Sequence, residues 1–135
     1  MSFLKARFGH TGWEIGRMSF AKGVNIVGGA SKLFKFATSN DVTGKVTTYA
    51  DRRFGEGDVY LKLGFEFVKT TSPGLFYFHR GSGTKYSRFA CQKHNLPKLL
   101  GDKYVDSDTA AVNLERSGFI ELRDCGHNLY VYDPK

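Results

Sequence analysis

The sequence is poor in the features that mark disulfide-rich, multi-domain or membrane-spanning proteins. Its 135 residues contain only two cysteines, Cys91 and Cys125, which are too few for a disulfide framework and favour a reducing compartment. Only three prolines occur, with no linker-like tract and no internal repeat. No apolar run reaches the roughly 18 residues of a membrane span, and residues 1–5 are too short to open a signal peptide. We therefore expect one cytoplasmic domain with no membrane association.

Positive charge exceeds negative charge in this sequence. There are 20 lysines and arginines against 13 aspartates and glutamates, a formal net charge of +7. Hydrophobic residues at 41% and aromatic residues at 15% can build a core, which excludes a disordered tail. A polyanion is the partner that such a charge favours, because each phosphate paired with a cation releases condensed counterions. The alternative is a surface of solvated lysines with no partner.

Cations and aromatic side chains are interleaved in the middle of the chain, whereas residues 102–108 are acidic. Guanidinium groups beside aromatic rings suit phosphate contact and base stacking together. We expect the cations to neutralise DNA phosphates and the tyrosines to stack on bases or to position the sugars. The candidate DNA-binding residues are Arg52, Arg53, Arg80, Arg88 and Lys93, together with Tyr49, Tyr77 and Tyr86.

Helical and strand patterns alternate along the sequence, which predicts an α/β or α+β protein built around a mixed sheet. The predicted strands are Trp13–Phe20, a short buried Val24–Val27, Val46–Ala50, Phe65–Val68 and Leu75–Phe78. The predicted helices are Ala30–Ala37, Glu56–Leu63, Arg88–Leu100 with a break at Pro97, and Asp108–Ser117. We expect Phe119–Leu122 and Asn128–Tyr132 to pair as a hairpin. The expected core contains Trp13, Phe20, Phe34, Phe36, Leu63, Phe65 and Phe67.

A glycine pair stands between a predicted strand and a predicted helix, in the run Gly28-Gly29-Ala30-Ser31. Glycines allow close approach of a ligand, and the free amides of a helix N-terminus favour an anion such as a pyrophosphate. Neither the dinucleotide-binding fingerprint nor the P-loop pattern fits this run. A tight turn without a ligand is the alternative interpretation.

A second motif follows the first. The strand Val46–Asp51, a helix ending in the run Tyr60–Phe65 and a further strand resemble the second half of the GNAT acyltransferase fold. The resemblance implies that Gly28, Gly29, Ala30 and Ser31 would bind the pyrophosphate of acyl-CoA. It also implies that Tyr60 would act as a general acid toward the coenzyme A thiolate.

Several motifs in order cover roughly residues 1–132. They are Met1-Ser2-Phe3, Arg7-Phe8-Gly9, Trp13-Glu14-Ile15, Arg17, Gly28–Phe34, Tyr49–Phe54, Tyr60–Phe65, Pro73 followed by Tyr77, Tyr86–Phe89, Gln92-Lys93-His94, Leu96 and Asp124-Cys125-Gly126. Together they resemble the C-terminal module of phage homing endonucleases of the Hef-like kind. In those enzymes this region follows a separate nuclease domain, which we do not find in this sequence. The resemblance implies a phage protein related to a DNA-acting module, located in the cytoplasm of the infected bacterial host.

Cleavage and metal binding have few candidate residues. A nuclease centre needs clustered carboxylates or a histidine pair, and Glu66–Lys69 lacks the usual spacing, so enzyme activity and catalytic residues stay open. Cys91-x-x-His94 and Cys125-x-His127 contain zinc-ligand types. A buried small hydrophobe explains Cys91 equally well, and we expect no metal. Asp51, beside Arg52 and Arg53, is expected to form a structural ion pair.

These observations predict a single domain over residues 1–135. A GNAT-like core, a mixed sheet flanked by helices, would span residues 1–80, and a helix-helix-hairpin extension over 81–135 would pack on it. The expected function is DNA binding through a basic, aromatic-rich surface, without a cofactor. One alternative is an acyltransferase that uses acyl-CoA. Another is a phage protein that binds a host defence factor.

Overall fold

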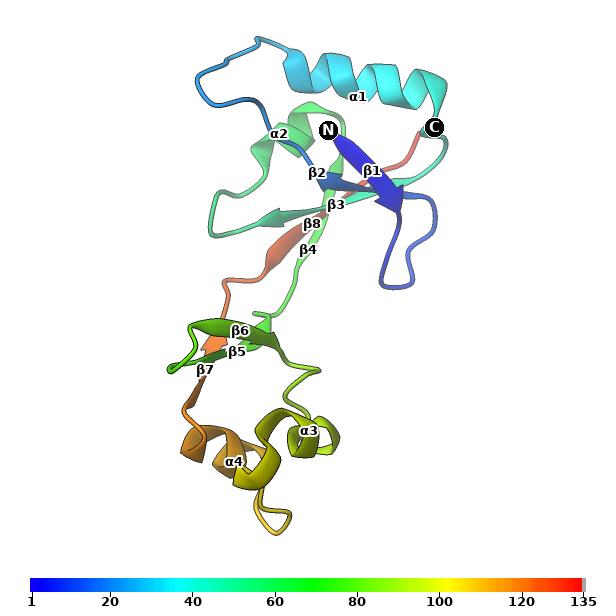
Figure 1. The fold of residues 1–135 in the computed structure, drawn as a ribbon. Coiled ribbons are helices and arrows are strands. Elements are labelled where there is room, and N and C mark those ends of the chain that lie inside the picture. Colours follow the sequence, from blue (N-terminus) through cyan, green and yellow to red (C-terminus); the bar gives the residue numbers. More distant parts are fainter. Residues whose placement is uncertain (135) are drawn as a thin grey trace. The chain divides into compact units, whose positions relative to one another are not determined.

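The computed structural model describes residues 1–134, whose contacts form two compact units (Figure 1). Unit 1 comprises Met1–Ser72 together with the segment that begins at Cys125, and unit 2 comprises Pro73–Asp124. Unit 1 contains a five-stranded sheet and two α-helices, and unit 2 contains a three-stranded sheet and two α-helices. The α+β class is therefore confirmed. The units divide at Ser72 and Asp124 rather than at residue 80, because the strand that precedes residue 80 pairs within unit 2.

The sheet of unit 1 has the strand order β1-β2-β3-β8-β4. The strands β2 and β3 are parallel, and every other neighbouring pair in this sheet is antiparallel. Helix α1 connects the two parallel strands, and the short helix α2 connects β3 to β4. The elements are β1 (Ser2–Lys5), β2 (Trp13–Arg17), α1 (Gly29–Asn40), β3 (Val46–Asp51), α2 (Asp58–Lys62), β4 (Glu66–Thr70) and β8 (His127–Tyr132).

Both helices of unit 1 pack on the same face of this sheet. The side chain of Phe34 on α1 is 5% exposed, and its ring lies 5.1 Å from that of Phe65 and 5.0 Å from that of Tyr132. Val46 and Ala50 of β3 join this core. Since successive strand residues point to opposite faces, Thr47, Tyr49 and Asp51 point to the other side of the sheet. We call that side the helix-free face.

Two kinds of sequence expectation for unit 1 are wrong, one for a strand and one for the core. Val24–Val27 is an exposed loop, not a buried strand, and Val27 is 89% exposed. Gly23 and Gly28 on either side have positive φ angles of 79° and 69°, which end extended structure there. Phe20, Phe36 and Phe67, expected in the core, are exposed. Phe36 points away from the buried side of α1 that carries Phe34, so an aromatic residue in a helix did not by itself indicate burial.

Unit 2 has the strand order β6-β5-β7, with all pairs antiparallel. Its buried cluster consists of Cys91, Leu96 and Leu114. The elements are β5 (Leu75–His79), β6 (Thr84–Ser87), the 3₁₀ segments η1 (Lys93–Asn95) and η2 (Gly101–Lys103), α3 (Leu96–Leu100), α4 (Ala110–Arg116) and β7 (Phe119–Arg123).

Two expectations for the C-terminal third are also wrong. The α-helix predicted over Arg88–Leu100 begins only at Leu96, and Pro97 lies in its first turn, where a residue without an N–H is tolerated. The predicted hairpin between Phe119–Leu122 and Asn128–Tyr132 does not form. Strand β7 pairs with β5 in unit 2, whereas β8 lies between β3 and β4 in unit 1. Within residues 1–134, no helix is long and apolar enough to cross a membrane.

A candidate nucleic-acid interface

The eight candidate DNA-binding residues are distributed over both units. Tyr49, Arg52 and Arg53 lie at the end of β3 in unit 1. The other five belong to unit 2, and they are Tyr77, Arg80, Tyr86, Arg88 and Lys93. The structure therefore brings the three residues of unit 1 together in one segment.

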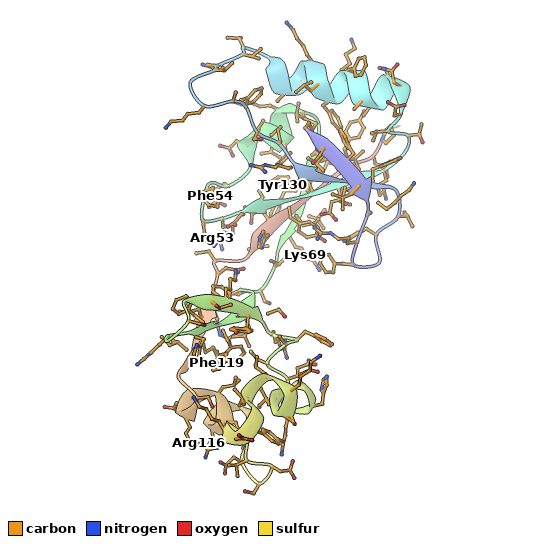
Figure 2. All side chains as sticks on the ribbon, in the orientation of Figure 1. Arg53, Phe54, Lys69, Arg116, Phe119 and Tyr130 are labelled. Atoms are coloured by element: carbon orange, nitrogen blue, oxygen red, sulfur yellow. The ribbon has the colours of Figure 1, made fainter. Side chains whose placement is uncertain are left out.

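The helix-free face of unit 1 combines aromatic rings and cations from separate parts of the sequence. The loop between β1 and β2 places the Phe8 ring edge-on to Tyr49, at a centroid distance of 6.0 Å. Lys69 of β4 lies opposite Leu129 of β8, on the same face as Tyr49. Figure 2 shows Arg53 and Lys69 on the side of the sheet away from α1. This face thus carries Arg7, Phe8, Tyr49, Arg53, Lys69 and His127.

Asp51 and Arg53 form the structural ion pair that the sequence predicted. The Arg53 Nε donates to both Asp51 carboxylate oxygens at 3.0 Å, and the Arg53 backbone N–H donates to Oδ1. These hydrogen bonds lower the pKa of Asp51 from 3.8 to about 2, and the His127 Nε2, 4.0 Å away, adds to the effect. Asp51 is therefore ionised at neutral pH and offsets part of the charge of Arg53.

The Arg53 guanidinium also lies over the Phe54 ring, 5.5 Å from its centroid. Phe54 is 86% exposed, so its ring is accessible to a ligand while the Arg53 guanidinium lies over it. A second pair of the same kind occurs in the β1–β2 loop, where the Arg7 guanidinium is 5.4 Å from the centroid of Phe8. Phe8 is 77% exposed. Both arginine–phenylalanine pairs therefore present a highly exposed ring, and that of Phe8 also contacts Tyr49.

Arg52 has a different environment from its neighbour. Its Nη1 donates to the backbone carbonyl of Cys125 at 3.2 Å, and its Nε lies 3.9 Å from Glu56 Oε2. The side chain remains 39% exposed. Arg52 therefore links the end of β3 to the segment that precedes β8, while part of its guanidinium stays accessible.

Glu14 is a buried carboxylate beneath the β1–β2 loop. It is 1% exposed, and Arg7 binds both of its oxygens through Nε and Nη2. These hydrogen bonds and the charge of Glu14 raise the pKa of Arg7. Burial, followed by the nearby Glu14 charge, raises the pKa of Tyr49, so its phenol is neutral at pH 7. A neutral ring beside an arginine suits stacking better than a charged phenolate.

In unit 2 the two candidate tyrosines contribute to packing. Tyr77 and Tyr86 lie opposite each other on β5 and β6. Both rings pack against the cluster of Cys91, Leu96 and Leu114. Because one side of each ring is in contact with this core, base stacking on them is restricted.

The three cations of unit 2 lie on separate elements. Lys93 on η1 donates from Nζ to the carbonyl oxygen of Asp106 at 3.0 Å. Arg80 borders a hollow between β7 and α4, together with Glu115 and Glu121. Arg88 follows β6 and is exposed. The acidic neighbours reduce the positive potential of this unit.

The glycine run forms the N-cap and the first turn of α1, and no strand leads into it. Gly28 has a left-handed conformation, and no side chain caps the helix. The amide of Lys32 bonds to the carbonyl of Gly28, whereas no hydrogen bond of the described chain satisfies the amides of Ala30 and Ser31. Tyr60 on α2 is half-buried, with its ring 5.6 Å from that of Tyr130. These amides and Tyr60 are the elements that the acyl-CoA hypothesis requires.

The cysteine and histidine pairs do not combine into a metal centre in the described part of the chain. Cys91 is buried in unit 2, and Cys125 is exposed in unit 1. Among residues 1–134, no group of three His, Cys, Asp or Glu side chains is placed to hold a metal ion. Burial raises the pKa of the Cys91 thiol, as expected for a small hydrophobic core residue.

Sequence reasoning did not select Arg7, Phe8, Lys69 or His127 as DNA-binding residues, although it named His127 as a zinc-ligand type. A usable signal was present for two of them, since Arg7-Phe8 repeats the Arg-Phe dipeptide found at Arg53-Phe54. Lys69 and His127 reach this face only through strand pairing. Comparison with known proteins gives no matching protein-family model and no matching curated protein.

Proposed function

We propose that this chain binds DNA through the helix-free face of unit 1. One observation carries the proposal. Two exposed arginine–phenylalanine pairs lie in unit 1: Phe8 of the pair Arg7–Phe8 contacts Tyr49 on this face, and the pair Arg53–Phe54 directly follows β3, with Arg53 bound to Asp51 of this face. Exposed rings provide stacking platforms for bases, and the neighbouring cations track the phosphate backbone. This arrangement favours contact with unpaired or splayed bases over readout of a closed duplex.

The charge distribution supports the same surface. Unit 1 contains twelve lysines and arginines against seven aspartates and glutamates, and unit 2 contains eight against six. On the helix-free face, Glu14 and Asp51 are each already paired with an arginine. Lys69 and the exposed parts of Arg7 and Arg53 would contact phosphates. Such contacts orient DNA without reading its sequence.

Binding of a fluorescein-labelled 20-nucleotide DNA, single-stranded and duplex, tests the proposal by anisotropy. Replacement of Phe8 and Phe54 by alanine should weaken single-strand binding at least tenfold, since each stacked base contributes about 1–3 kcal/mol. Lys69→Ala should reduce the slope of log K against log salt by about 0.7 for a single strand. The matched control is Phe36→Ala with Lys35→Ala, two exposed residues on the helix side of the same unit. Equal losses in both sets would overturn the assignment of this face.

We keep a GNAT-like architecture for unit 1, and the relation to phage homing-endonuclease modules, as proposals. The order β2-β3-β8-β4, with β2 and β3 parallel and joined by α1, supports the first. The second rests on the motifs of the sequence alone. It would place the protein in an infected bacterial host.

A second candidate function, acyl-CoA binding, follows from one observation. The pairing of β2 with β3 ends at Ile15 and Thr48, although both strands continue, and α1 begins with two uncapped amides. Diverging parallel strands and a free helix N-terminus suit an amide-containing phosphate ester. Calorimetric titration with acetyl-CoA tests this candidate, and no heat at millimolar ligand would exclude it. Tyr60→Phe should leave binding intact and abolish any acyl transfer.

A further inference from the structure

The helix side of unit 1 presents an unusual stretch of sequence. Residues 15–40 contain Arg17, Lys22, Lys32 and Lys35 but no aspartate or glutamate. All four cations are exposed, and no salt bridge within the described chain involves them. This surface therefore has a positive potential that no neighbouring carboxylate of the segment offsets.

The same stretch exposes six large apolar side chains, which we call the apolar strip. Their exposed fractions range from 43% for Phe20 to 89% for Val27. Single exposed hydrophobic residues are common, but a contiguous group usually marks an interaction surface. The strip consists of Phe20, Val24, Ile26, Val27, Leu33 and Phe36.

Helix geometry makes much of this strip continuous. Gly29, Leu33 and Phe36 are spaced i, i+4 and i+7, so they lie along one flank of α1. A Cβ atom on Gly29 would lie 2.9 Å from Phe20 Cε1 and 3.1 Å from Ile26 Cβ, so the backbone of Gly29 contacts both side chains. Because Gly29 has no side chain, Phe20 and Ile26 of the preceding loop can pack directly against this flank of α1.

Within the strip, Leu33 lies on the flank of α1 that faces β1, and Phe36 lies farther from the sheet, on the side of α1 away from Phe34. The opposite flank, with Ser31 and Lys35, borders a hollow shared with Lys62 and Tyr132, on the α2 side. Sheet order places β1 at the other edge, and Phe3 of β1 stacks on Phe34 at 6.5 Å. No strand of the described chain pairs with the outer edge of β1. Such an edge has backbone donors and acceptors available to another strand.

We propose that the edge of β1 and the apolar strip together bind an extended segment of a partner protein, in which acidic residues accompany apolar ones. The partner strand would add to β1, its apolar side chains would pack on Leu33 and Phe36, and its carboxylates would pair with the lysines. This is the β-augmentation mode of peptide recognition, with charge complementarity for specificity. The uncapped amides at the start of α1 offer a further place for a carboxylate.

Three other occupants fit this surface less well. A second copy of the chain would bring the same cations face to face. A nucleic acid would leave Val24, Ile26 and Val27 without apolar contacts. A lipid bilayer would place the unpaired backbone groups of β1 near hydrocarbon, where they find no hydrogen-bond partners.

Selection from a random twelve-residue peptide library on the immobilised full chain tests the proposal. Enriched peptides should contain at least two carboxylates and two apolar residues. Replacement of their glutamates by glutamine should weaken binding at least tenfold. In the labelled protein, NMR shift changes should be confined to residues 2–5 and 17–36. Enrichment of peptides without acidic residues, or shift changes elsewhere, would overturn it.

Matched variants distinguish specific peptide binding at this surface from non-specific hydrophobic adsorption. Phe36→Asp should abolish binding of the selected peptides, whereas Phe89→Asp should not, although both rings are 68% exposed. Lys32→Glu with Lys35→Glu should weaken binding tenfold or more. A membrane is the alternative partner. If the protein selects no peptide but co-sediments with phosphatidylglycerol vesicles, and Val27→Asp abolishes this co-sedimentation, the surface binds a membrane and the protein-partner proposal is overturned. Phe8 and Phe54 variants should keep peptide binding, so failure here is separate from failure of the DNA proposal.

Discussion

Arg7 and Glu14 form an ion pair whose two members differ sharply in burial. The Glu14 side chain is 2% exposed, whereas that of Arg7 is 57% exposed. A carboxylate without solvent depends on its partner, because its own desolvation is otherwise uncompensated. The pair also fixes the β1–β2 loop that carries Phe8. The ion pair that stabilises the buried Glu14 therefore also positions Phe8, one of the rings proposed to stack on bases.

Arg7→Ala should destabilise the protein by about 1–3 kcal/mol, the cost of leaving a buried acceptor without its donor. Urea unfolding followed by circular dichroism measures this change. The double variant Arg7→Ala with Glu14→Gln should recover part of the loss, since the buried charge is gone. Full additivity of the two substitutions would contradict the dependence of Glu14 on Arg7.

Asp51 and Arg53 give a prediction for acid pH. The pKa of Asp51 is lowered to about 2 from 3.8, so the ion pair stabilises the folded state above about pH 4. This contribution should be lost as the pH falls from about 4 through 2, because the carboxyl becomes protonated. NMR titration should find the Asp51 pKa near 2 in the parent protein and clearly higher in Arg53→Ala, although the backbone N–H at position 53 and His127 continue to lower it in the variant. An unchanged pKa in the variant would contradict this ion pair.

The same pair gives a prediction for affinity. Asp51→Asn removes the negative charge beside Arg53 while it keeps a side chain of similar shape. DNA binding should become stronger and its salt dependence steeper, by up to about 0.7 in slope for a single strand. Glu121→Gln is the control, because Glu121 pairs with an arginine in unit 2. Weaker binding by Asp51→Asn would argue against phosphate contact by Arg53.

Local pattern predicted most elements but not their partners. The helix around Phe34 and the β-branched strand beginning at Val46 were recognised, because periodicity and branching report directly on local structure. The apparent hairpin failed because β7 and β8 are neighbours in sequence but belong to different sheets. Turn residues at 124–127 indicate a change of direction, and they do not say which strands will pair afterward. Long-range pairing had to come from the structure.

The candidate site shows the same limit. Arg52, Arg53 and Tyr49 were found from their clustering in sequence, and the predicted ion pair of Asp51 is confirmed. Lys69 and His127 reach the helix-free face only through their register with β8 and β3. Tyr77 and Tyr86 look equivalent to Tyr49 in sequence, yet their rings pack on the core of unit 2. All three tyrosines are half-buried, so residue type and proximity to arginine do not tell which groups a tyrosine ring will contact.

The two thiols should differ in reactivity. The thiolate is the reactive form, and burial both shields Cys91 and raises its pKa, whereas Cys125 is exposed. In the folded protein, iodoacetamide at pH 8 should label Cys125 rapidly and Cys91 only after unfolding. Mass spectrometry of the digested protein measures each site. Equal labelling rates at the two cysteines would contradict the burial of Cys91.

Tyr77 and Tyr86 should affect stability more than DNA affinity. Tyr77→Ala removes a ring from the cluster around Leu114 and should cost about 2–3 kcal/mol in unfolding free energy. At temperatures where the variant remains folded, its affinity for single-stranded DNA should stay within about twofold of the parent, since the proposed stacking rings lie in unit 1. Thermal unfolding and anisotropy on the same samples separate the two effects. A tenfold loss of affinity in a folded Tyr77→Ala protein would show that unit 2 also contacts bases, and the interface would then have to extend beyond the helix-free face.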